Sequence, residues 1–585
     1  MPNNPGGASQ PPSLEKRLPI ALALMMLVLI ASQYLFKTAP GPKPVAPVNH
    51  KAAAQLAQKP AATATTAPQT NAVANTATAV PAGQIQATSV ATTTIDTDVY
   101  RIVFTNQGAA VKSWVLKKYT DNTGKPLQLI HLDNKGNPLT LANGQPCPLP
   151  FTIEVTGQRL DVDPNSVLYQ AQTASNGLAV DYAYSDGKVT IHKSFQFAKD
   201  SYLVNVKSQV VVNNTPAPSL LMWRGGFGDF AVHNASGYEH TIWYDGAAGK
   251  LIRKSTKDAK NGPITDTGSY TFGGLEDNFF AAVALPPDNG SLEVRTYSDE
   301  LKIPGEEKPA AFIGAGLSTG AQNDFALFVG PKDIDILKQV NPKLTQIVDW
   351  GFFGVIAKPL FVWLNWTNDH WTNNYGWAII VVTLIINLAL FPLRISSLKS
   401  ARKMQRLQPQ IQAINAKYKN IKLNDPRKAE QNQEIMDLYK REGVNPVGGC
   451  LPMLIQLPFF YAFYRVLAIA IELRHAPWLW VPDLSSPEAL PIHILPIILI
   501  ATQFFTQRLT PTAGVDPNQQ RMMMLMPLLF GFMFYYASAG LVLYWLTGNV
   551  VGIAFQLIIN RFMPTPAPAT PAPVSKAPVK KTVKR

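Results

Sequence analysis

Long apolar segments constrain the fold of this chain most, because about 20 consecutive apolar residues are long enough to cross a bilayer. Five such segments in the C-terminal part are predicted to be membrane spans, at 377–393, 450–471, 494–509, 523–537 and 541–559. Another apolar stretch, 18–36, follows Lys16 and Arg17. Its length exceeds the usual apolar core of a signal peptide, so we expect an uncleaved N-terminal anchor. The chain is therefore predicted to be a membrane protein with six spans.

Composition indicates a mixture of soluble and membrane-embedded parts. The 585 residues are 46% hydrophobic and the mean hydropathy is +0.02. A net charge of +14 would suit nucleic-acid binding, but the charge gathers beside the apolar segments, where it sets topology. The two cysteines, Cys147 and Cys450, provide neither a disulfide framework nor a metal cluster. No phosphate-binding loop or nucleophile–base pair is evident. We therefore expect that the chain binds no metal and no cofactor and is not an enzyme.

The region 98–344 is predicted to be a β-sandwich domain. Tyr100, Ile102 and Phe104 recur at every second position, and turn signals punctuate such runs. Folds of this kind often bind sugars, but no constellation of carboxylates or histidines demands catalysis, so a binding or scaffolding role is favoured. The preceding stretch, 37–97, is rich in Ala, Thr and Pro and is expected to be a disordered tether.

Tryptophan is concentrated just before the first C-terminal span. Five of the eleven tryptophans lie between Trp350 and Trp377. Aromatic residues are enriched at membrane interfaces, so 345–374 is predicted to be an interfacial amphipathic helix leading into a helical core at 375–562. A buried aromatic cluster at the base of the β-domain is the alternative.

Positive charge assigns the two sides of the membrane. Between Arg394 and Pro446 there are 12 Lys/Arg and 5 Asp/Glu, and the 561–585 segment has 6 Lys/Arg and no acid. Such segments stay in the cytoplasm. Residues 1–17 and the basic tail 563–585 are therefore predicted to be cytoplasmic, and the β-domain to be periplasmic, in a bacterial inner membrane.

The basic segment 397–446 is predicted to be a helical hairpin. Apolar residues from Met404 to Tyr418 repeat at alternating spacings of three and four, and a second helix returns through Ile435 and Leu438. The hairpin could be a solvated stalk or a dock for an anionic partner such as ribosomal RNA. The residues expected to make such a contact are Arg402, Lys403, Arg406, Lys580, Lys581, Lys584 and Arg585.

Arg465 lies deep within the 450–471 segment, and no neighbouring apolar segment offers it a carboxylate. A charge at such depth costs about 2.5–3.5 kcal/mol on insertion scales. The alternatives are an arginine that reaches a headgroup or one that faces a wet cavity. Polar residues in other spans favour the cavity. The predicted groove residues are Arg465, Asn387, Thr383, Gln456, Leu457, Pro458, Gln503, Gln507, Trp545 and Thr547.

Several motifs closely resemble the YidC family of membrane protein insertases. They are MQRLQPQIQAINAKY at 404–418, MDLYKREGVNPVGGCLPMLIQLPFFYAFY at 436–464, and shorter stretches at 472–485, 516–530 and 538–551. The resemblance implies a Gram-negative-type member with a periplasmic super-sandwich and a five-span core. It also implies insertion and folding of nascent membrane proteins, alone or beside the Sec translocon, within the lipid bilayer.

The chain departs from the family pattern in one place. The family carries a groove arginine in its second span, whereas this chain has TLIINLALFPL at 383–393, with Asn387 at that position. Arg465 lies seven residues after Pro458, hence within about 20° on the same helix face, and the resemblance makes Leu457 and Pro458 client-contacting positions. We therefore expect Arg465 to supply the groove charge.

Two other classes of function compete with an insertase. A secondary transporter generally uses intramembrane acids or histidines, which these spans lack. A membrane-anchored sugar-binding or scaffold protein would need neither the basic hairpin nor polar residues within the bundle.

Overall fold

The computed structural model describes residues 84–230, 238–287, 290–304, 306–418, 425–444, 451–509, 525, 527–529 and 531–562. The predicted N-terminal anchor and the basic tail lie outside these ranges, as do residues 523, 524, 526 and 530 of the predicted 523–537 span.

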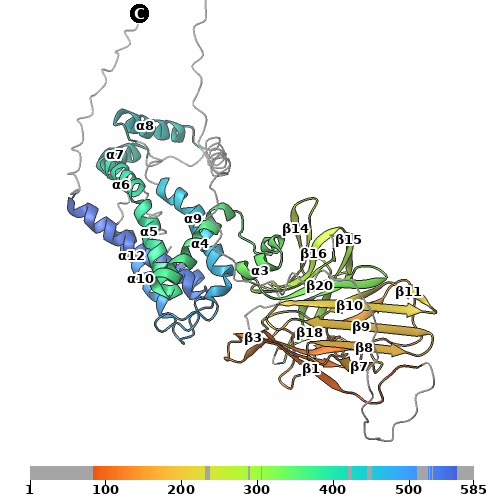
Figure 1. Ribbon diagram of the computed structural model, residues 1–585. Helices are drawn as coiled ribbons and strands as arrows, with labels where there is room; N and C mark the ends of the chain where they lie inside the picture. Colours follow the sequence, from red (N-terminus) through yellow and green to blue (C-terminus); the bar gives the residue numbers. More distant parts are fainter. Residues whose placement is uncertain are drawn as a thin grey trace, which may run out of the picture. The chain divides into compact units, whose positions relative to one another are not determined.

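The N-terminal half is built from antiparallel sheets, and the largest has ten strands, several of which lie side by side in Figure 1. In order, these are β14 (Lys250–Lys254), β13 (His240–Asp245), β16 (Tyr270–Glu276), β17 (Phe280–Leu285), β20 (Gln322–Pro331), β10 (Leu203–Val212), β9 (Val189–Phe197), β8 (Ala179–Ser185) and β7 (Gln170–Thr173), with β11 (Thr215–Ala217) beside β10.

Two smaller sheets complete the β-domain. One has six strands: β15 (Ile264–Gly268), β18 (Leu292–Lys302), β19 (Ala310–Ser318), β12 (Ser219–Trp223) and β6 (Thr152–Val155), with β5 (Thr140–Leu141) paired to β18. The other has four: β1 (Thr92–Asp96), β2 (Tyr100–Thr105), β3 (Ala110–Thr120) and β4 (Pro126–Gln128).

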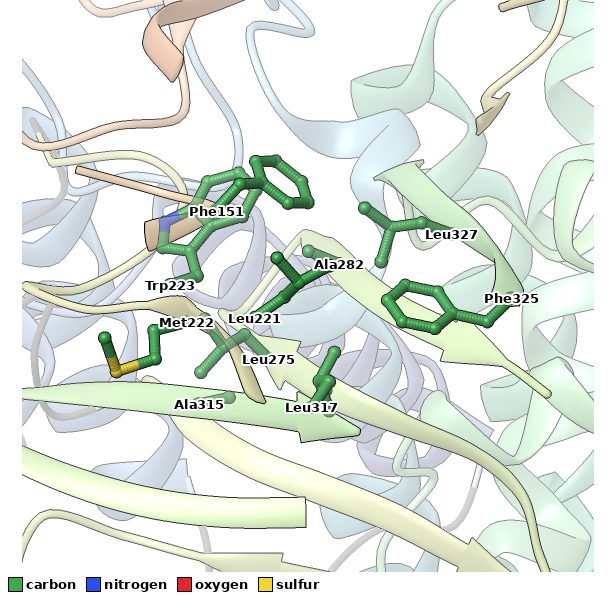
Figure 2. A pocket seen from close by; sticks show the side chains of 11 residues that line it. Phe151, Leu221, Met222, Trp223, Leu275, Ala282, Ala315, Leu317, Phe325 and Leu327 are labelled. Carbon is green, nitrogen blue, oxygen red and sulfur yellow. The ribbon is translucent and has the colours of Figure 1, made fainter. Parts of the chain in front are cut away.

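The two larger sheets pack face to face. A cavity of only about 20 Å³ remains between them, and its lining side chains are almost all apolar. Figure 2 shows Leu275 and Phe325 of the ten-stranded sheet close to Leu221 and Leu317 of the six-stranded sheet. A gap of this size and polarity is a packing defect in a dry core rather than a ligand site. The predicted β-sandwich is confirmed.

The β-domain begins earlier than its sequence pattern indicates. Strand β1 pairs with β2 in the stretch predicted to be tether, and Ile95, opposite Ile102, is fully buried. The predicted boundary at residue 98 is therefore wrong. Three consecutive threonines open this strand, and their β-branched side chains favour extended backbone despite the surrounding low-complexity composition.

Helices form the C-terminal part of the described chain (Figure 1). They are α3 (Ile334–Val340), η3 (Pro342–Ile347), α4 (Gly354–Thr367), η4 (Asn368–Thr372), α5 (Tyr375–Ala389), α6 (Phe391–Arg406), α7 (Gln408–Lys417), α8 (Arg427–Arg441), α9 (Leu451–Ile469), η5 (Ile471–Leu473), α10 (Ile494–Leu509) and α12 (Ala539–Phe562).

Among the described helices, α12 alone is by itself long and apolar enough to cross a membrane. The helical stretches Gly354–Thr372 and Tyr375–Ala389 pass that test only together, and they are bent by 116°. Asn373, in the left-handed conformation, ends the first. Asn374 caps the second, because its side chain accepts from the N–H groups of Gly376 and Trp377. The six-span arrangement stays a prediction.

Helices α7 and α8 pack against each other, as the spacing of their apolar residues predicts. Leu407, Ile411 and Leu438 are buried in one small core. The first predicted helix is broken, however: α6 ends at Arg406 and α7 begins at Gln408, with a proline in its first turn. Proline lacks an N–H and is favoured at a helix start.

A buried lysine ties loops to the ten-stranded sheet. Lys193 lies on the core face of β9 and is 1% exposed. Its ammonium donates to the carbonyl oxygens of Gly108 at 2.6 Å, Phe151 at 2.7 Å and Ala109 at 3.2 Å. All three residues have positive φ angles. Burial lowers the pKa of Lys193 to about 7, while the carbonyl dipoles favour its charged form.

We expect Lys193→Met to destabilise the β-domain strongly, because it leaves three buried carbonyls without a donor. Each such group costs about 1–3 kcal/mol. Chemical denaturation of the full chain in detergent, followed by tryptophan fluorescence, measures the loss. Lys207→Met is the matched control: Lys207 lies on neighbouring β10, and its side chain is 52% exposed and pairs with Asp324, so its loss should cost no more than about 1 kcal/mol. Equal losses of stability for the two substitutions would contradict the inference that Lys193 holds these loops to the sheet.

Candidate functional site

Five of the described helices form the core of the bundle. Helix α12 packs against α5 and α10, and α4 packs against α9 and α5. Their shared apolar core includes Ile379 of α5, Phe463 of α9, Leu499 of α10 and Leu543 of α12. Polar residues on these helices therefore have to be satisfied within the bundle or by water.

Arg394 is the cation that contacts several of these helices. It lies in the first turn of α6, just after the break at Leu390. Its Nη2 donates to Oε1 of Gln456 on α9 at 3.3 Å. A Cβ on Gly552 of α12 would lie only 2.9 Å from its Nη1, so that glycine makes room for the guanidinium. Within the described chain, Arg394 has no carboxylate as an ionic partner.

A second arginine lies two turns further along α6. Arg402 is 7% exposed and its Nη2 donates to Oδ1 of Asn560 at 2.5 Å. Arg394 meets α12 at Gly552, so α6 and α12 run alongside each other in the same direction. Arg402 was expected to contact an external partner, and this expectation is wrong. The guanidinium holds α6 against α12 and is not available at the surface.

Arg465 does not lie free in the middle of a span. It is in the last turns of α9, its Nη2 is 3.0 Å from Oδ2 of Asp349, and it also donates to the Asp349 carbonyl at 2.6 Å. Burial alone raises the pKa of Asp349, but the Gly351 N–H and Arg465 hold it below its ordinary value. The expectation of an unpaired cation is wrong because the acid comes from the segment before α4, outside every apolar run.

Asn387 and Thr383 share a face of α5, as predicted, but their polar atoms bond within their own helix. Asn387 Nδ2 donates to the Thr383 carbonyl at 2.8 Å, and Thr383 Oγ1 donates to the Ile379 carbonyl at 2.6 Å. Both side chains are at most 5% exposed. These two residues therefore face packed helices rather than an open groove.

Other predicted groove residues are linked in pairs. Gln503 of α10 accepts from Asn549 of α12 at 2.7 Å, and Thr547 donates to the Leu543 carbonyl at 2.7 Å. Trp545 packs edge-on against Phe460 of α9 with ring centroids 4.5 Å apart.

The remaining predicted groove residues differ in their exposure and in their place along the helices. Leu457 is 50% exposed, while neighbouring Pro458 is buried inside α9. Gln507 lies near the end of α10. The described residues hold no cluster of three His, Cys, Asp or Glu side chains that could bind a metal ion.

Arg394 has one signal in the sequence besides its place in the basic segment that sets topology. It directly follows the 377–393 apolar stretch, seven residues after Asn387. A glycine within an apolar helix, such as Gly552, is a second signal, because it marks a close approach.

Two family models together match most of the chain. The 60Kd inner membrane protein model matches residues 366–566, and the YidC periplasmic domain model matches residues 92–363. The β-domain and the helical part thus correspond to a periplasmic domain and an inner-membrane domain. The periplasmic match begins at the residue where β1 begins.

Similar proteins agree with these models. The membrane protein insertase YidC of Geotalea daltonii is 33% identical over 94% of this chain and 100% of its own length. That of a Geobacter species is 35% identical over 80% of this chain and 85% of its length. A crystal structure of an active YidC insertase is 20% identical, with a TM-score of 0.33, and covers 80% of this chain and 94% of its own.

The chain belongs to the YidC family of membrane protein insertases. The family is one of insertases and not of enzymes, so the predicted class is confirmed. Neither a secondary transporter nor a sugar-binding scaffold is favoured by these matches.

Proposed function

We propose that the chain inserts nascent membrane proteins into the bacterial inner membrane through a hydrated groove whose positive charge is Arg394. The observation that supports this proposal is a guanidinium that touches an amide of α9 and a glycine of α12 and has no carboxylate partner in the described residues. Arg394 is half-buried, and a charge at such a place without an acid needs water around it. Water in the groove lowers the cost of moving a polar client segment, and a positive charge attracts acidic segments.

The driving force comes from the client. Once its polar segment has crossed, about 20 apolar residues of the client leave sideways into lipid and are buried there. The apolar face of α9 that includes Leu457 and Tyr461, which are 50% and 39% exposed, suits such a transfer. The chain itself forms no covalent bond in this mechanism.

Arg394→Gln should impair insertion of clients with acidic translocated segments more than of clients with neutral ones, because only acidic segments gain from the charge. A tenfold difference corresponds to about 1.4 kcal/mol. Arg394→Lys should retain most of the activity, since a diffuse attraction needs no planar fork. Protease protection of newly made clients in vesicles measures insertion.

Arg465→Gln is the matched control for this experiment. Its charge is paired with Asp349, so any loss should be equal for acidic and neutral clients. The proposal is wrong if Arg394→Gln also affects both kinds of client equally.

We further propose six spans with both chain ends in the cytoplasm and the β-domain in the periplasm. The excess of Lys and Arg in 397–446 and 563–585 supports this topology. Single cysteines at Lys576 and at exposed Val90 should react with a membrane-impermeant reagent from opposite sides of the membrane. Labelling of both from the same side would contradict it.

The hairpin and the tail are proposed to contact the translating ribosome, and the core to work alone or beside the Sec translocon. Lys403 and Arg406 are exposed on α6, unlike Arg402. Charge reversal of these two residues together with Lys580, Lys581, Lys584 and Arg585 should weaken co-sedimentation with ribosomes, and added salt should do the same. Reversal of Arg402 alone is expected to destabilise the α6–α12 contact instead. Unchanged ribosome binding in the six-residue variant would count against the contact.

A further inference from the structure

A cavity of about 940 Å³ lies between α9, the helical residues 531–535 and the β-domain. This volume is at the upper end of the range of about 300–1,000 Å³ found for ligand pockets. Aromatic side chains form the wall on the helical side, including Phe460, Tyr461 and Tyr464 of α9, and Phe534 and Tyr536. Tyr536 is 71% exposed and Tyr464 is 38% exposed, so this wall is open to an occupant.

Charged side chains form the opposite wall, and they occur in pairs. Arg253 and Lys332 both bond to Glu276, with N–O distances of 2.6 and 3.1 Å. Arg474 pairs with Asp229, and both side chains are at most 4% exposed. Arg465 pairs with Asp349. Asp277 and Asp483 line the cavity as well, so five acidic side chains stand against four basic ones and the lining has no excess of positive charge.

Several contacts hold the two walls together. Ile469 and Ile471, at the end of α9 and in η5, are buried in the main core of the β-domain. Asn278 Nδ2 donates to the Ala468 carbonyl at 3.0 Å, and His475 Nδ1 lies 3.0 Å from Thr120 Oγ1. The cavity is therefore part of a packed junction.

Aromatic side chains connect the lining of the cavity to the core of the helical bundle. Phe460 and Phe534 line it, and both also pack against Trp545, with ring centroids 4.5 and 4.7 Å apart. Trp545 is one of the predicted groove residues. A segment that leaves the bundle at this end therefore meets the cavity first.

We propose that this cavity receives the translocated segment of a client polypeptide as it leaves the bundle on the β-domain side. The inference rests on the proposed function. The phosphate of a phospholipid headgroup would require an excess of positive charge, and the lining has none, because five acidic side chains stand against four basic ones. A polypeptide offers apolar side chains to the aromatic wall and amide dipoles to the paired charges. The cavity should accept acidic and neutral segments alike, in contrast to Arg394.

Site-specific photocrosslinking in the full chain tests this inference. A photoreactive amino acid replaces Tyr464 in the cavity, Gln456 in the groove, or Val90, which is 61% exposed on the β-domain and does not line the cavity. Ribosome-bound clients of increasing length carry either an acidic or a neutral translocated segment. An unchanged circular dichroism spectrum and thermal unfolding curve show that each variant is folded.

We expect the translocated segment to crosslink at Gln456 in shorter clients and at Tyr464 in longer ones, with similar yields at Tyr464 for both charges. Adducts at Val90 should be absent. The inference about the cavity would be overturned by a client that crosslinks at Gln456 but never at Tyr464, or by lipid as the sole adduct at Tyr464. Either result would leave the proposed groove unaffected. Loss of client adducts at Gln456 would overturn the groove itself.

Discussion

A half-buried arginine at the end of the helical bundle, with no acid beside it among the described residues, is the constraint on which this structure depends. Arg394 is charged at any relevant pH, and its described surroundings offer the Gln456 amide and the space left by Gly552, but no carboxylate. A carboxylate would neutralise the charge and remove its attraction for a client. An amide satisfies one donor and leaves the charge intact. The remaining donors still need partners, and this is the reason that the proposed mechanism places water around Arg394.

The junction of the two domains uses charge in the opposite way. Arg474 and Asp229 are almost fully buried, and the end of α9 lies in the β-domain core. Such a pair adds little net stability compared with apolar residues, but loss of one partner costs about 3–5 kcal/mol, because the other is left buried and unpaired. The pair therefore specifies one arrangement of the domains more than it strengthens the fold.

Much of this architecture was predictable because it depends on local patterns. Alternating burial in the strands, the bounds of α10 and the apolar seam shared by α7 and α8 all follow from periodicity. Residues whose role depends on distant partners were not predictable. Asp349, before α4, neutralises Arg465, and Lys193 lies on a core face because the carbonyls of two distant loops surround its ammonium. Arg394 directly follows an apolar stretch and Arg465 lies within one, but the sequence pattern shows the partner of neither.

Arg394 without an acid and Arg465 paired with Asp349 fit one mechanism, because a client segment has to be released as well as captured. A path that binds a segment too strongly at its exit would retain it, so binding has to be favourable enough for entry and weak enough for departure. Arg394 can attract an acidic segment into the bundle. If Arg465 were also unpaired, the same segment would meet a second trap at the far end of α9. Asp349 removes that trap, and the paired charges around the adjoining cavity keep the exit neutral. In the proposed mechanism, Asp349 therefore has a functional role. It leaves the unpaired positive charge at Arg394 alone, at one end of the path, so that an acidic client segment is attracted at that end and released at the other.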